Sequence, residues 1–164
     1  MRFFRLRRAV FLLLLISTSS IAVTAAAEEK KFQSDEWVTE CDTATGAPDC
    51  SITVPFWQGE RQRDGAFALV VMLQTGNIGI VGQPPPTRAV LRVDRNPPIE
   101  CRQARYCVFS SAQAPAVFRQ LKDASLIVVD VFTAQGTFSF NLTPKGYQAG
   151  IAKIRSWGYR LPGD

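Results

Sequence analysis

Hydrophobic and polar residues alternate along much of the chain after residue 35, which is the pattern of strands with one buried face. The clearest case is residues 88–94, where Ala89, Leu91 and Val93 share one face and mostly charged residues share the other. Residues 66–73 are apolar on both faces, as in a strand buried within a sandwich. The predicted strands are residues 37–41, 50–56, 66–73, 78–81, 88–94, 106–110, 125–132 and 137–142, after a polar lead-in at 28–35.

Two segments carry apolar residues at helical spacing instead. The first is Ala114–Lys122, with a proline tolerated in its first turn. The second is predicted to begin at Thr143 as N-cap, with Pro144 in the first turn. The apolar stripes are Val117, Phe118 and Leu121 in the first helix, and Tyr147, Ile151 and Ile154 in the second. Many short strands with two short helices predict a mainly β domain, an antiparallel β-sandwich or barrel-like fold.

The first 27 residues predict a secretory signal peptide. Four arginines precede the apolar run 9–16, and small residues lead to Ala25, Ala26 and Ala27, which is the order found in such peptides. A membrane anchor needs about 20 mostly apolar residues, whereas serines and threonines interrupt this stretch, so cleavage is favoured over an uncleaved anchor. We therefore expect a single mature domain of residues 28–164 in the periplasm, or beyond it at the outer membrane or as a secreted protein, with no transmembrane segment after cleavage.

Removal of the predicted signal peptide changes the net charge of the chain and therefore the classes of partner that it favours. Loss of its four arginines lowers the formal net charge from +5 to +1, so binding to nucleic acid loses its main support. A basic stretch remains at residues 88–105, which contains only Asp94 and Glu100 as acids. This arginine cluster is either a solvated strand face or a surface that binds phosphate or carboxylate groups of a partner. Its members are Arg88, Arg92, Arg95, Arg102 and Arg105.

Four cysteines in an exported chain predict disulfides. Three pairings are open, and we favour Cys41 with Cys50 and Cys101 with Cys107, because each pair encloses a short stretch that contains turn-forming residues. A redox or metal-binding role is the alternative. Neither spacing is the C-x-x-C of such sites, so that alternative has no motif in its favour.

Candidate catalytic groups are few. The chain has no histidine, which excludes Ser-His-Asp and Cys-His nucleophiles and removes the commonest transition-metal ligand. No phosphate-binding or calcium-binding loop motif is present. Asp130 lies in an apolar strand and is either a general acid or base or a hydrogen-bonded strand residue. Trp37, Trp57 and Trp157 are either a ligand platform or packing aromatics. We therefore expect no enzymatic activity, no cofactor and no metal.

The cysteine arrangement and the C-terminal half together resemble the invasion-associated locus B family of bacterial exported proteins. The residues that carry the resemblance are Trp37, Cys41, Cys50, Cys101, Cys107, the helix Ala114–Lys122, the strand pair 125–142 and the segment 146–151. The likeness extends over residues 37–157. It implies a periplasmic or surface-associated location and, for some members, a role in host-cell entry. Because members of that family have no established enzymatic activity, the resemblance implies no catalytic residue. Tyr147, where that family often has phenylalanine, and the proline loop 84–86 depart from it.

These observations predict a non-enzymatic exported protein that binds a protein or envelope component. An anionic surface is one candidate partner, and host invasion is one candidate role. The alternative is a periplasmic carboxylate-based enzyme or a small-ligand carrier. An enzyme or carrier needs a concave pocket that gathers polar groups, whereas a binding module can present a flat patch.

Overall fold

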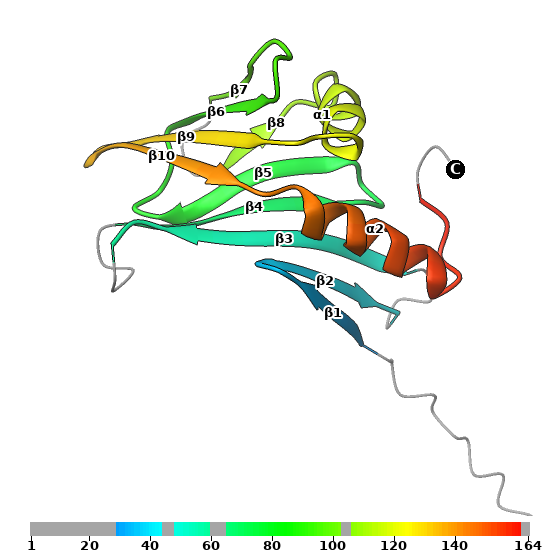
Figure 1. The fold of residues 1–164 in the computed structure, drawn as a ribbon. Helices are drawn as coiled ribbons and strands as arrows, with labels where there is room; N and C mark the ends of the chain where they lie inside the picture. Colours follow the sequence, from blue (N-terminus) through cyan, green and yellow to red (C-terminus); the bar gives the residue numbers. More distant parts are fainter. Residues whose placement is uncertain (1–28, 44–47, 60–64, 103–105, 162–164) are drawn as a thin grey trace, which may run out of the picture.

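The computed structural model describes residues 29–43, 48–59, 65–102 and 106–161, and the predicted signal peptide lies outside them. These residues form two antiparallel sheets packed face to face, with two helices beside them (Figure 1). The strands are β1 (Lys30–Ser34), β2 (Trp37–Asp42), β3 (Asp49–Trp57), β4 (Ala66–Met72), β5 (Asn77–Gln83), β6 (Arg88–Val93), β7 (Ile99–Cys101), β8 (Cys107–Phe109), β9 (Ile127–Thr133) and β10 (Gly136–Leu142). The helices are α1 (Ala114–Lys122) and α2 (Lys145–Ser156). The predicted mainly β fold is confirmed.

The larger sheet has the strand order β1-β2-β3-β4-β5-β8, and the smaller sheet has the order β10-β9-β6-β7. Alternate residues of the strands are buried between the sheets, as the period of two requires. An aromatic cluster joins the two sheets, because Phe56 and Phe67 of β3 and β4 meet Phe138 and Phe140 of β10. Their ring centroids across the sheets are 4.7 to 5.9 Å apart. This cluster contributes a large buried apolar area to a small domain.

Helix α2 covers the larger sheet where the smaller sheet does not, and it contacts β1, β2 and β3 (Figure 1). Gly146 and Gly150 lie one turn apart on its buried face, where the helix comes closest to Trp37 and Thr39. Helix α1 contacts β5 and α2. The two helices therefore lie next to one another at one end of the sandwich.

Both predicted disulfides are confirmed. Cys41–Cys50 joins directly opposed residues of β2 and β3, within the larger sheet. Cys101–Cys107 joins β7 of the smaller sheet to β8 of the larger one, so it links the two layers. All four cysteines are paired. In the loop-entropy account, a disulfide that closes so short a loop contributes about 2 kcal/mol to stability.

The structure corrects several of the predicted boundaries. Strands β1 and β7 were not predicted, because β1 has a polar, edge-strand sequence and β7 has only three residues. One face of β4, predicted to be buried, is partly exposed, because the smaller sheet covers the other face only. Helix α2 begins at Lys145 with Pro144 at the N-cap position, rather than with Thr143 there.

Candidate functional site

The outer face of the smaller sheet holds most of the predicted arginine cluster. Arg88 of β6 reaches Glu100 of β7, with 2.9 Å between Arg88 Nε and Glu100 Oε1, and its Nη2 donates a hydrogen bond of 3.0 Å to Glu100 Oε2. The Arg88 guanidinium also lies 4.5 Å from the centre of the Phe132 ring. Arg102 pairs with the same Glu100 carboxylate, and these contacts lower the pKa of Glu100, chiefly through its hydrogen bonds to the two arginines.

The remaining arginines have different surroundings. Arg92 pairs with Asp130 of β9, with 2.7 Å between Arg92 Nη1 and Asp130 Oδ2. Arg95 is exposed in the turn after β6, and Arg105 lies outside the described residues. The structure thus gathers Arg88, Arg92 and Arg102 on one face and gives each a carboxylate partner, which neutralises part of the positive charge locally. That this face binds anions stays a prediction.

Asp130 is a hydrogen-bonded strand residue in this structure. Ser139 lies directly opposite on β10 and donates a hydrogen bond of 2.6 Å from its hydroxyl to Asp130 Oδ1, while Arg92 contacts the other carboxylate oxygen. Both oxygens therefore have partners from neighbouring strands. These contacts account for a carboxylate in an apolar strand without a catalytic role.

The three tryptophans do not share one surface. Trp37 is only 1% exposed and belongs to the core, whereas Trp57 at the end of β3 is 44% exposed. Trp157 follows α2 and is partly buried against the core. Their burial favours packing roles over a shared ligand platform.

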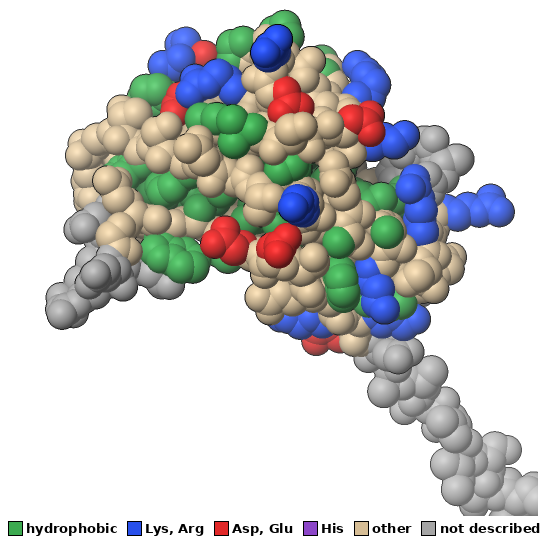
Figure 2. Space-filling view, in the orientation of Figure 1, with side chains coloured by type: hydrophobic (Ala, Val, Ile, Leu, Met, Phe, Trp, Pro, Cys, Tyr) green, Lys and Arg blue, Asp and Glu red, His purple; other side chains and the backbone are tan. Residues whose placement is uncertain are grey.

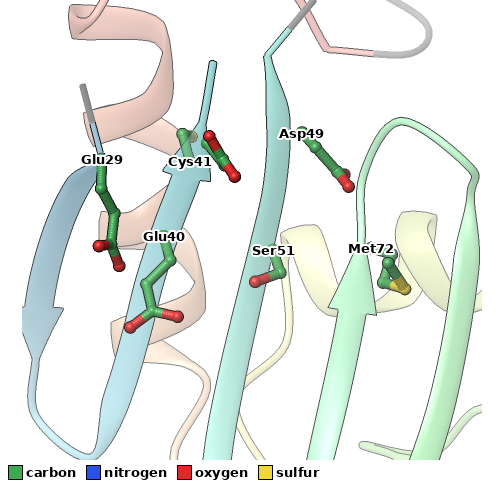
Figure 3. Close-up of a pocket in the computed structure, with 7 residues that line it drawn as sticks. Glu29, Glu40, Cys41, Asp49, Ser51 and Met72 are labelled. Atoms are coloured by element: carbon green, nitrogen blue, oxygen red, sulfur yellow. The ribbon is translucent and has the colours of Figure 1, made fainter. Parts of the chain in front are cut away.

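An acidic depression of about 520 Å³ lies over β2, β3 and β4 (Figure 3). Asp42 and Asp49 occupy directly opposed positions on β2 and β3, and Glu40 lies beside them, paired with Lys31. Like charges placed opposite each other on a sheet are unfavourable. Within the part of the chain that the structure describes, no three His, Cys, Asp or Glu side chains are arranged to hold a metal ion.

A larger cavity of about 750 Å³ lies where α1, α2 and the turn between β4 and β5 meet. We call this cavity the helix groove. Tyr147 of α2, which is 3% exposed, is among its lining residues. Apolar side chains from four segments line it, namely Leu73, Phe118, Ile151 and Leu161. The helix groove is concave, mainly apolar and within the size range of small-ligand sites.

Positively charged side chains form part of the lining of the helix groove. Arg119 and Lys122 from the last turn of α1, and Arg155 from α2, line it, and no Asp or Glu is among its described lining residues. Figure 2 shows lysine and arginine side chains gathered on the side of the molecule where α2 and the end of the chain lie. A groove with apolar walls and cations at its edge is suited to a molecule that is both apolar and anionic.

The spacing of residues on α1 and a side-chain contact from α2 define the helix groove between the two helices. Arg119 and Lys122 are three residues apart, so they project from neighbouring positions on α1. Gln148 Nε2 donates hydrogen bonds of 3.0 Å to the Lys122 carbonyl and 3.4 Å to the Ala124 carbonyl, which ties α2 to the end of α1. Sequence reasoning missed this site. The sequence contained one local indication of it, the basic residues Arg119 and Lys122 next to Phe118. The packing of α1 on α2 cannot be inferred from the order of residues along the chain.

Burial raises the pKa of Tyr147 to about 12, an effect that the nearby Arg155 charge opposes. The folded protein therefore favours the neutral phenol, and this contribution to stability is fully present below pH 10 and lost as pH rises toward 12. We expect wild type to lose about 2 kcal/mol more stability over this range than Tyr147→Phe. Urea unfolding of both proteins between pH 9 and pH 11.5 measures the difference, and parallel pH profiles would contradict it.

Comparison with known proteins finds a solved structure with a similar fold. No protein-family model and no curated protein matches the sequence. Among solved structures, the chain is similar to the crystal structure of invasion associated protein B from Bartonella henselae, with 15% sequence identity and a TM-score of 0.53. The match covers 81% of this chain and 99% of that one. The likeness is one of fold. It agrees with the fold implied by the family resemblance, while family membership itself is not shown.

Within the described ranges, no helix has the length and apolar character needed to cross a bilayer.

Proposed function

We propose that this chain is an exported, non-enzymatic binding protein of the bacterial envelope and that the helix groove is its binding site. The observation that carries the proposal is the groove itself, a cavity of about 750 Å³ with apolar walls and Arg119 and Lys122 at its edge. The rigid sandwich beneath it supports a preformed site, because disulfides hold β2 to β3 and β7 to β8.

The proposal also includes a location outside the cytoplasm and a biological role. Two disulfides are typical of proteins that fold outside the cytoplasm, which supports export by the predicted signal peptide. A role in host-cell invasion is the narrowest form of the proposal. It is supported by analogy with the fold-level neighbour, which is an invasion associated protein.

The helix groove also bears on the alternative functions. A carboxylate-based enzyme needs acidic groups in its cavity, and the described lining of the helix groove contains none. Asp130, the acid singled out from the sequence, lies on the smaller sheet and is held by Arg92 and Ser139. A small-ligand carrier, by contrast, would use the same groove as an envelope-binding protein. The two binding functions therefore converge on one site.

Filling the groove tests this proposal. Ala152 is exposed and lines the cavity, so Ala152→Trp should occupy it without disturbing the core. Co-sedimentation of the purified mature protein with a bacterial envelope fraction should fall at least about fivefold in this variant. Ala134→Trp is the matched control, because Ala134 is exposed in the turn between β9 and β10, away from the groove.

The rival surface is tested in the same assay. The triple variant Arg92→Ser, Arg95→Ser, Arg102→Ser removes charge from the arginine cluster, and we expect its retention to stay near that of wild type. Lost retention in the triple variant together with normal retention of Ala152→Trp would move the binding site to the arginine cluster. Equal retention of all variants would refute a role for the helix groove.

A further inference from the structure

We infer that the ligand of the helix groove is a single-chain amphiphile, one acyl chain that ends in an anionic head group. This inference rests on the proposed function and narrows it to a chemical class. Three features of the groove carry it: its apolar walls, the exposed cations Arg119 and Lys122, and the lack of any strand residue among its described lining residues.

The apolar walls come from separate parts of the chain that meet along the groove. Leu73 follows β4, Phe118 lies on α1 and Ile151 on α2. Phe118 and Ile151 are partly exposed and packed against the core, so each keeps apolar surface for a ligand. Burying the methylenes of an acyl chain against these walls removes apolar surface from water and so favours binding, and a cavity of about 750 Å³ has room for such a chain.

The head group is assigned from charge. Arg119 and Lys122 are exposed at the end of α1, and neither takes part in an ion pair among the described residues. The arginine cluster differs here, because Arg88, Arg92 and Arg102 already contact carboxylates of the protein. A carboxylate or phosphate placed between Arg119 and Lys122 would form charge-assisted hydrogen bonds without displacing an internal partner.

An extended peptide suits the groove less well. A bound peptide must pair its backbone N–H and C=O groups, usually along a strand edge, and no strand residue is among the described lining residues of the groove. The side-chain amide of Gln148, one of the polar lining residues, already donates to the carbonyls of Lys122 and Ala124. An acyl chain has no backbone groups to satisfy.

Isothermal titration calorimetry with dodecanoate, kept below its micelle concentration, tests the inference on the mature protein. We expect one saturable site, weaker binding as salt increases, and at least a tenfold loss of affinity in the double variant Arg119→Gln, Lys122→Gln. Arg95→Gln is the charge control, since Arg95 is exposed in the turn after β6 and is not among the described lining residues of the groove. Ala152→Trp should abolish the binding heat, and circular dichroism checks that each variant is folded.

The ligand series separates the possible outcomes. Dodecyltrimethylammonium carries the opposite charge and dodecanol carries none, so equal binding of either would overturn the anionic head group. Acetate carries no long chain, and binding as tight as that of dodecanoate would overturn the acyl chain. If no amphiphile binds while Ala152→Trp still reduces retention on envelope material, the inference falls and the proposed function stands. If no amphiphile binds and Ala152→Trp is retained on envelope material as well as wild type, both the inference and the proposed function are refuted.

Discussion

Replacing Trp37 with alanine should lower the free energy of unfolding by about 4 kcal/mol. The side chain is 1% exposed, and its ring meets the Tyr147 ring edge-on with 5.7 Å between centroids. Its Nε1 donates a hydrogen bond of 2.6 Å to the Thr143 carbonyl just before α2. Truncation therefore creates a cavity and also leaves a carbonyl without its donor, which adds to the loss.

A matched substitution isolates the effect of burial. Trp57 is 44% exposed, so Trp57→Ala should change stability by less than about 1 kcal/mol. Trp37→Phe should fall between the two, because it keeps an aromatic ring but loses the indole N–H. Urea denaturation of the three variants under one set of conditions gives the comparison. Equal losses for Trp37→Ala and Trp57→Ala would show that Trp37 does not join β2 to α2.

The strands with clear alternation were predicted correctly because one signal, burial of every second residue, determines them. In β6 the predicted inward set Ala89, Leu91 and Val93 is buried. Strand β1 gave no such signal, since its partner β2 and the helix α2 supply the contacts that hold it. The position of β7 likewise depends on its pairing with β6 and on the disulfide to β8. Such tertiary contacts override local propensity.

The candidate site was harder to predict from sequence than the fold. Arginines close together in sequence drew attention to residues 88–105, yet the carboxylates that pair with them come partly from β9, nearly 40 positions further on. The helix groove is the reverse case, because its lining comes from residues 73 to 161 and no segment looks like a site alone. A cavity is a property of packing, so its position could not be read from any local pattern.

The second large effect is expected at Gly146 on α2. A Cβ at this position would lie 2.5 Å from the Ser34 carbonyl oxygen and 2.6 Å from Trp37 Cγ, closer than real Cβ atoms come to such atoms. The Ser34 carbonyl belongs to the backbone of β1, and Trp37 is packed in the core, so neither can move away easily. Glycine is thus required by the close approach of α2 to β1 and β2, and not by its backbone conformation.

Two opposing effects decide the sign of Gly146→Ala. Alanine in a helix interior is favoured over glycine by about 1 kcal/mol, which is an upper value for Gly146 in the first turn of α2, while overpacking of a fitted core costs up to about 3 kcal/mol and occasionally more. Because a backbone carbonyl is one of the obstructing atoms, we expect overpacking to exceed the propensity gain and leave a net loss of about 2 kcal/mol. Ala152→Ser adds one heavy atom at an exposed position of the same helix and should cost less than about 1 kcal/mol. Urea unfolding measures both changes, and tryptophan fluorescence reports whether Trp37 has been displaced. A Gly146→Ala protein as stable as wild type would mean that α2 packs further from the sheet than this structure places it, and the width of the helix groove would then have to be revised with it.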